Sequence, residues 1–154
     1  MSVRWNDVRV GDELPEMTVN VTPTVVVATA IATRDFMPVH HDRDYANSQG
    51  APDVFMNILS DTGFCSRFLT DWGGPDAFVT KLAIRLGVPV FPGTTLAYTG
   101  AVTGVSTGES DRAGDGGRAG GDGRAPEGFV DIAFRATTGL GEHLTGTATV
   151  SLPR

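Results

Sequence analysis

An apolar helical pattern from Asp53 to Asp71 is the feature that most constrains how this chain can fold. Its large side chains recur at helical spacings and cover much of the circumference, with Asp53 as the expected N-cap. A helix that is apolar on most sides is normally enclosed by other elements, because water would otherwise contact those side chains. Gly73, Gly74 and Pro75 then end the helix. The pattern predicts a long helix that the rest of the chain surrounds.

Four strand-like runs follow this helix. Each run is rich in β-branched or aromatic residues and alternates roughly between polar and apolar side chains. The runs cover residues 77–86, 94–105, 129–138 and 144–152. Several antiparallel strands after one long helix predict an α+β fold in which a sheet wraps the helix. Such a small curved sheet leaves an edge strand, so pairing with a second copy or with a homologue is expected.

The segment from Ser106 to Gly128 separates the second strand-like run from the third. It consists mainly of Gly, Asp, Arg, Ser and Ala and has almost no apolar side chains to bury. This composition predicts a disordered hairpin tip within a single domain that spans residues 1–154. The alternative is a mobile lid or a basic patch formed by the arginines of the segment.

The N-terminal part of the chain gives weaker signals. Polar–apolar alternation predicts a half-buried strand at residues 17–21. Thr22 and Pro23 form a typical helix start, so a helix is predicted over residues 25–33, although its valines also favour strand. One further helical turn is predicted at residues 44–48.

The composition excludes several classes of protein. The formal net charge is −6 and no basic stripe is visible, which argues against a nucleic-acid partner. A single cysteine, Cys65, cannot form an internal disulfide and is expected to be a small core residue of an intracellular protein. No apolar run is long enough to span a membrane, and the N-terminus lacks the apolar stretch of a signal peptide. A cytoplasmic location without membrane attachment is therefore predicted.

A carboxylate and an imidazole lie close together in sequence, at Asp35 and His40. Pro38 between them fixes its own φ and biases Met37 away from helix, so the stretch predicts a bent, rigid connection. A carboxylate and an imidazole that point into one cleft can serve general acid–base catalysis. The alternative is a loop with a surface aspartate and a structural histidine.

Other polar residues near this stretch are weaker candidates for chemistry. His41 is expected to face away from His40, because adjacent side chains of an extended segment point in opposite directions. Adjacent histidines rarely share a metal ion and no third ligand follows at a suitable spacing, so no metal site is predicted. Asn57 and Asp61 lie one helical turn apart. They are expected either to line the cleft or to form an internal cap or a bridge to a partner.

Two motifs resemble those of the MaoC-like dehydratases and (R)-specific enoyl-CoA hydratases. The first runs from Asp35 to His40 with Ala46 after it, and the second runs from Arg85 to Leu96. Both occur in the family's order, with the long helix between them. The family has the hot-dog fold, in which a curved antiparallel sheet wraps a long central helix. The resemblance implies this fold for the whole chain except the glycine-rich insertion.

The same resemblance implies a reaction and a site. Asp35 and His40 would be the catalytic pair that adds water to the α,β double bond of an acyl-CoA thioester, without a cofactor. Backbone N–H groups near Met56 and Asn57, at the helix N-terminus, would stabilise the charge on the thioester oxygen. The chain departs from the family pattern there, since Phe55 and Met56 replace its usual His-Gly pair.

A narrower resemblance concerns substrate and partner. The stretches 32–36, 39–44 and 57–63 are similar to the small subunits of heteromeric MaoC-like hydratases that act on shortened steroid (cholesterol) side chains. This implies a larger MaoC-like partner subunit in an α2β2 heterotetramer, and a homodimer is expected otherwise. Met37 replaces the motif's usual asparagine, and its larger apolar side chain could suit a steroid-sized acyl group.

Two alternatives remain open at this point. In a hot-dog thioesterase, a carboxylate on or near the long helix, such as Asp53 or Asp61, would be the general base, and Asp35 would have no role. In a non-catalytic acyl-binding subunit, the chain would shape the pocket and stabilise its partner. The presence of both Asp35 and His40 favours the hydratase.

Overall fold

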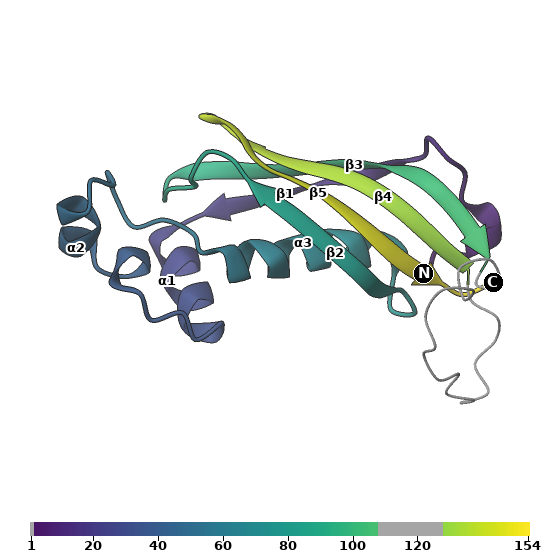
Figure 1. Cartoon of the computed structure of the whole chain (residues 1–154), viewed down its shortest axis with the longest axis horizontal. Coiled ribbons are helices and arrows are strands. Elements are labelled where there is room, and N and C mark those ends of the chain that lie inside the picture. Colours follow the sequence, from purple (N-terminus) through teal and green to yellow (C-terminus); the bar gives the residue numbers. More distant parts are fainter. Residues whose placement is uncertain (1, 108–127) are drawn as a thin grey trace.

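A five-stranded antiparallel sheet curves around a long helix in the computed structural model, which describes residues 2–107 and 128–154 (Figure 1). The strand order is β1-β3-β4-β5-β2, so β1 and β2 form the two edges. The elements, in chain order, are η1 (Trp5–Asp7), β1 (Glu13–Val21), α1 (Pro23–Ala32), η2 (Pro38–His40), α2 (Arg43–Ser48), α3 (Ile58–Gly73), β2 (Phe78–Leu86), β3 (Thr94–Thr107), β4 (Gly128–Thr138) and β5 (Gly141–Leu152).

The core lies between the sheet and α3. Along β4, buried and more exposed side chains alternate, as expected for a strand with one face against the core. The ring of Phe68 on α3 packs near the rings of Tyr98 on β3 and Phe134 on β4, with centroid distances of 5.9 and 6.2 Å. Burying one such large side chain contributes about 1.5–3 kcal/mol to stability. The sheet that wraps α3 confirms the predicted α+β hot-dog arrangement. The helix is not enclosed on every side as predicted, since Ile58 and Leu59 are 50% and 48% exposed.

The long helix begins at Ile58 and not at Asp53 as predicted. The preceding residues are held outside the helix because the Met56 N–H donates to the Val90 carbonyl, at 3.1 Å. Asn57 is the actual N-cap, and its side-chain oxygen accepts from the Ser60 N–H at 3.0 Å.

Asp53 has a different role from the predicted cap. Its carboxylate forms an ion pair with Arg43, with Nε and Oδ1 2.8 Å apart, and also accepts from the Val54 N–H. The pair joins the start of α2 to the segment before α3. It therefore braces the connection between the two helices.

The remaining predicted elements agree closely with the structure. Thr22 caps α1, and its hydroxyl oxygen accepts from the Val25 N–H at 3.1 Å. The strand predicted at residues 17–21 is the second part of β1, which begins earlier, at Glu13. The short turn α2 and the four later strands are also confirmed. Ser106 and Gly128, the two ends of the predicted hairpin tip, belong instead to β3 and β4. Residues 108–127 of that prediction lie outside the described residues.

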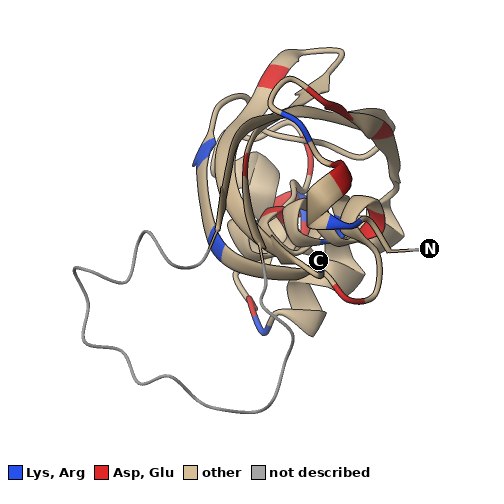
Figure 2. Cartoon of the chain, turned by 90° about the vertical axis from the view of Figure 1, so that its right-hand side faces the viewer, with Lys and Arg blue, Asp and Glu red and all other residues tan. Residues whose placement is uncertain are grey.

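Charged side chains are spread over several elements, and Figure 2 shows Lys and Arg dispersed among Asp and Glu in the described part of the chain. This distribution accompanies the net charge of −6. Within residues 2–107 and 128–154, no helix combines the length and the apolar composition needed to cross a membrane.

Candidate active site

The backbone at the end of α1 fixes the direction in which Asp35 leaves the helix. The Arg34 N–H donates to the Ile31 carbonyl and the Asp35 N–H to the Ala30 carbonyl, at 3.0 and 2.9 Å. This pair of bonds is the Schellman motif, which requires a left-handed residue at its centre. Arg34 occupies that position with φ of 58°. A non-glycine residue there costs about 1–2 kcal/mol, so local strain accompanies the placement of Asp35.

Both oxygens of the Asp35 carboxylate are held in place. Oδ1 accepts from the Met37 N–H at 3.3 Å, and Oδ2 accepts from Nδ2 of Asn57 at 2.9 Å. Oδ2 also lies 3.4 Å from Nε2 of His40. The Asp35 side chain is 22% exposed, so the carboxylate is oriented by the protein and can still be reached from outside.

His40 has a defined orientation and tautomer. Its Nδ1 lies 2.7 Å from the Phe55 carbonyl oxygen, which can only accept a hydrogen bond, so Nδ1 carries a proton. The Phe55 ring also packs edge-on against the imidazole, with centroids 5.1 Å apart. Nε2 is thus the nitrogen that faces Asp35 and is available for proton transfer.

Asn57 connects the pair to the start of α3. Its Nδ2 donates to Asp35 and to the Thr33 hydroxyl, at 2.9 and 3.0 Å. Its Oδ1 accepts from the N–H and from the hydroxyl of Ser60. With the side chain buried and these contacts made, one amide group fixes both the helix N-terminus and the carboxylate.

The Asn57 hydrogen bond is the largest influence on the acidity of Asp35. This bond lowers the pKa of the Asp35 carboxyl below its ordinary value, and burial offsets part of that effect. The hydrogen bond from the Met37 N–H and the charge of His40 lower the pKa further. The net effect is a lowered pKa, so Asp35 is a carboxylate at neutral pH. A carboxylate beside an imidazole can take a proton from water and pass one to a carbon centre.

The predicted oxyanion position lies at the N-terminus of α3, where the structure distinguishes between N–H groups. The Met56 N–H already donates to Val90, and the Met56 side chain is buried. Among the described residues, nothing accepts from the N–H groups of Asn57 and Ile58, as expected at the first turn of a helix. These two groups, together with the partial positive charge of the helix N-terminus, are the donors available at the end of α3 where the Asn57 side chain binds Asp35.

Asp61 was a candidate for lining the cleft, and it lies instead in the interior. It is fully buried and its Oδ1 lies 2.9 Å from Nε2 of His143, a residue on β5 that the sequence did not single out. Nδ1 of His143 lies 2.6 Å from the Val88 carbonyl oxygen. Cys65 is buried in the same region, and burial and then the charge of Asp61 raise the pKa of its thiol to about 12, so it is not a nucleophile.

His41 is exposed, with Nε2 3.2 Å from the Phe36 carbonyl oxygen. The described residues contain no group of three His, Cys, Asp or Glu side chains that could hold a metal ion.

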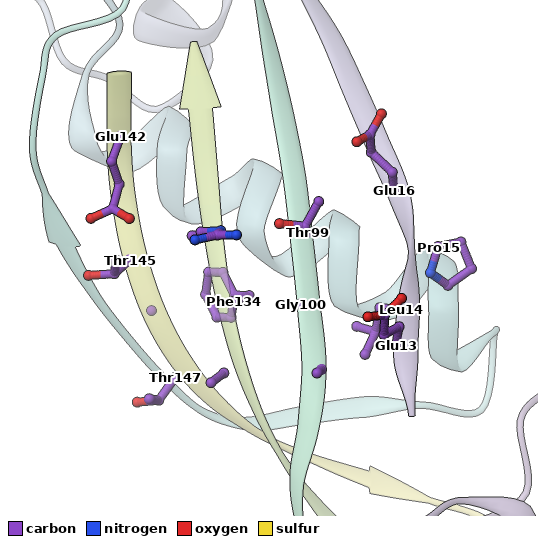
Figure 3. Close-up of a pocket in the computed structure, with 14 residues that line it drawn as sticks. Glu13, Leu14, Pro15, Glu16, Thr99, Gly100, Phe134, Glu142, Thr145 and Thr147 are labelled. Carbon is purple, nitrogen blue, oxygen red and sulfur yellow. The ribbon is translucent and has the colours of Figure 1, made fainter. Parts of the chain in front are cut away.

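Two grooves differ in their relation to the acid–base pair. An apolar groove of about 220 Å³ between α1 and α3 is lined by Thr33, Ser60 and Gly63 among others, and so adjoins the Asn57 network. A larger groove of about 1080 Å³ lies on the sheet. The lining of neither groove includes Asp35 or His40, but the smaller groove is lined by Thr33 and Ser60, which are hydrogen-bonded to Asn57, and the larger one is not. Figure 3 shows this larger groove with the strands in front of α3. The smaller groove is therefore the candidate for the reacting end of a substrate.

Comparison with known proteins places this geometry in a family. Residues 8–118 match the MaoC-like domain. The chain is 39% identical over 143 residues to the 3-oxo-4,17-pregnadiene-20-carboxyl-CoA hydratase beta subunit of Mycobacterium tuberculosis, covering 93% of this chain and 95% of that protein.

Solved structures of similar proteins agree with this family match. The ChsH1-ChsH2 complex from M. tuberculosis contains a chain with a TM-score of 0.77 and 38% identity, covering 94% of this chain and 98% of that one. The R-hydratase PhaJ1 from Pseudomonas aeruginosa has a TM-score of 0.79 at 19% identity, covering 99% and 87%, and shares the fold. Since the family match spans most of the chain and includes the Asp35–His40 segment, the protein belongs to the MaoC-like family of hot-dog proteins.

Proposed function

We propose that this chain is the catalytic subunit of a 2-enoyl-CoA hydratase, with Asp35 and His40 as its acid–base pair. The observation that carries the proposal is the pair itself: Asp35 Oδ2 and His40 Nε2 lie 3.4 Å apart, and each is held by a second contact. Asn57, which binds Asp35, also binds Thr33 and Ser60 in the lining of the small groove. Membership of the MaoC-like family and the similarity to a hydratase subunit support the hydratase class.

The geometry suggests how water is added. The Asp35 carboxylate takes a proton from water as the water oxygen bonds to Cβ, and the electrons of the double bond move toward the thioester oxygen. The N–H groups of Asn57 and Ile58, in the region expected from sequence around Met56 and Asn57, receive that charge. Asp35 passes the proton that it took from water across the 3.4 Å gap to Nε2 of His40, the nitrogen that carries no proton in the Nδ1–H form, and Nε2 then gives it to Cα. Atoms and charges balance, and no cofactor is needed.

The substrate proposed is a CoA thioester of a shortened steroid side chain. Its support is the 39% identity to a hydratase subunit whose name includes a pregnadiene-carboxyl-CoA. The small groove between α1 and α3 cannot enclose a molecule of that size by itself, at about 220 Å³. The remaining contact surface would therefore come from a second subunit.

A MaoC-like partner subunit is part of the proposal. Large apolar side chains remain exposed around the pair, among them Phe36 at 65% and Met37 at 53%. An exposed apolar patch of this kind is typical of a protein–protein or ligand contact. The match to a chain of the ChsH1-ChsH2 complex supports a hetero-oligomer, for which we propose an α2β2 assembly of single-domain chains in the cytoplasm.

Separate substitutions of the two groups test the function. Asp35→Asn and His40→Ala should each lower hydration of an enoyl-CoA by about 10²- to 10⁴-fold, while the complex still assembles. The matched controls are Asp44→Asn and His41→Ala, which change exposed neighbours of the same chemical types. Hydration is followed by the loss of ultraviolet absorbance of the conjugated thioester, with and without a co-expressed MaoC-like partner. Full activity in both variants, or loss of assembly with turnover unaffected, would favour the acyl-binding subunit.

The thioesterase alternative has less support from the geometry. Its candidate bases are occupied, because Asp61 is buried against His143 and Asp53 is paired with Arg43. Neither carboxylate is free to activate a water molecule beside a bound thioester.

A further inference from the structure

The interior contains a second carboxylate–imidazole pair that the proposed reaction does not use. Asp61 lies on α3, one turn after Asn57, and His143 lies on β5; Oδ1 and Nε2 are 2.9 Å apart. The side chains are 0% and 3% exposed, so no substrate can reach them. Oδ2 of Asp61 has no hydrogen-bond partner in the part of the chain that the structure describes. His143 is therefore the main polar support of a buried carboxylate.

His143 also holds the β2–β3 loop (Gly87–Gly93). Its Nδ1 lies 2.6 Å from the Val88 carbonyl oxygen, which requires a proton on Nδ1. With Nδ1 protonated, a hydrogen bond from Nε2 to Asp61 makes the ring an imidazolium that donates on both sides. Asp61 thus orients the ring, and the ring anchors the loop to α3.

The β2–β3 loop is in turn in contact with the segment that holds His40. The Val90 carbonyl accepts from the Met56 N–H at 3.1 Å, and the ring of Phe91 packs edge-on against Phe55 with centroids 6.3 Å apart. The Phe55 carbonyl accepts from Nδ1 of His40. The contacts are continuous from His143 through the loop to the imidazole of the active site.

A second connection runs along α3. The Asp61 N–H donates to the Asn57 carbonyl at 3.1 Å, and the Asn57 side chain binds Asp35. Asp61 is thus linked to both members of the acid–base pair, to His40 through the loop and to Asp35 through the helix N-terminus.

We propose that Asp61 and His143 are positioning residues for the acid–base pair: they fix the β2–β3 loop against α3 and so hold His40 and Asp35 at their working separation. The inference rests on the proposed hydratase function. A buried ion pair is often no more stabilising than an apolar pair of the same volume, so stability alone is a weak reason for placing one here. The directional contacts of this pair explain its location under the loop.

The variant Asp61→Asn removes the charge with little change in volume. We expect kcat for enoyl-CoA hydration to fall by about 10- to 100-fold, because small displacements of catalytic groups have effects of this size, with KM changed less than kcat. His143→Gln serves as the second variant if Asp61→Asn does not fold.

The control must destabilise the protein without touching the loop. Leu152→Ala does so, because Leu152 is buried on β5 near Gly73, at the opposite end of α3 from Asn57. Assays are run well below the melting temperature of every variant. Near-wild-type kcat in Leu152→Ala with reduced kcat in Asp61→Asn supports positioning. Equal losses in the two variants, or no loss in Asp61→Asn, would overturn it.

A readout independent of activity separates this inference from the hydratase proposal. The chain has only 3 histidines, so the imidazole nitrogens can be assigned by NMR with one variant for each. Asp61→Asn should shift the His40 signals away from the fixed Nδ1–H form, and Leu152→Ala should leave them unchanged. Unchanged His40 signals in Asp61→Asn would refute positioning even if hydration is confirmed. If the wild-type complex is inactive but Asp61→Asn still shifts the His40 signals, the hydratase proposal is refuted and the positioning inference is not.

Discussion

Replacing Asn57 tests whether one amide supports both the long helix and the Asp35 carboxylate. Asn57→Ala removes the cap from the Ser60 N–H and the hydrogen bond to Asp35 together. Asn57→Asp keeps an oxygen that can cap the helix but places a second carboxylate beside Asp35. Comparing the two variants separates the two functions of the residue.

The expected magnitudes follow from the contacts that are lost. Losing an N-cap costs about 1 kcal/mol, within a range of about 0.5–2. A hydrogen bond to a charged group contributes about 1.5–3 kcal/mol, and the lower end applies because the Asp35 side chain is 22% exposed. Asn57→Ala should therefore lower the free energy of unfolding by about 2.5 kcal/mol at neutral pH.

The pH dependence gives a sharper test, since the pKa of Asp35 is lowered in the folded protein, mainly by Asn57. A lowered pKa contributes stability above the unfolded value of about 3.9, and this contribution disappears as the pH falls through the folded value. The difference between wild type and Asn57→Ala, measured by urea denaturation, should shrink below about pH 4 until the contributions of the cap and of the bond to Thr33 remain. A difference that stays constant across this range would refute the proposed support of Asp35 by Asn57.

Three further predictions concern the Asp61–His143 pair and the β2–β3 loop that it holds. Asp61→Ala leaves His143 buried without its partner and should lower the free energy of unfolding by about 3–5 kcal/mol, measured by urea denaturation. Burial lowers the pKa of His143, but the hydrogen bond and charge of Asp61 and the hydrogen bond to the Val88 carbonyl raise it more, so the net effect is a raised pKa. The stability that protonated His143 contributes is complete below its unfolded pKa of about 6.5 and is lost as the pH rises through its folded pKa. Cys65 and Tyr98 nearby have raised pKa values and stay neutral over this range. Thermal melts from pH 6 to 9 should show this decline in wild type and not in His143→Gln. Gly87→Ala should destabilise the protein, because a Cβ there would overlap a β5 carbonyl oxygen, and an unchanged melting temperature would contradict this.

Most of the fold could be predicted from the sequence, because the local signals agree with one another. Alternation defined the strands, and Thr22 with Pro23 marked the start of α1. The predicted start of α3 was wrong, because Asp53 and Asn57 are both good N-cap residues. The choice between them depends on the bond from Met56 to Val90, a contact between segments far apart in sequence.

The site was predictable in part, for the same reason. Asp35 and His40 lie in one short motif, so their proximity follows from local geometry. The pair of Asp61 and His143 joins residues that are 82 positions apart, and no local pattern indicates such a contact. The signal available was that His143 directly precedes the strand-like run at residues 144–152, since an imidazole that faces a core needs a polar partner.

The most direct test of the central claim is the mass of the product formed from an enoyl-CoA in ¹⁸O-labelled water, with a co-expressed MaoC-like partner. Hydration by Asp35 and His40 predicts an intact hydroxyacyl-CoA that carries the label on the acyl chain, and almost none of it with Asp35→Asn. Release of free CoA, an unchanged enoyl-CoA, or equal labelling by Asp35→Asn would contradict the account.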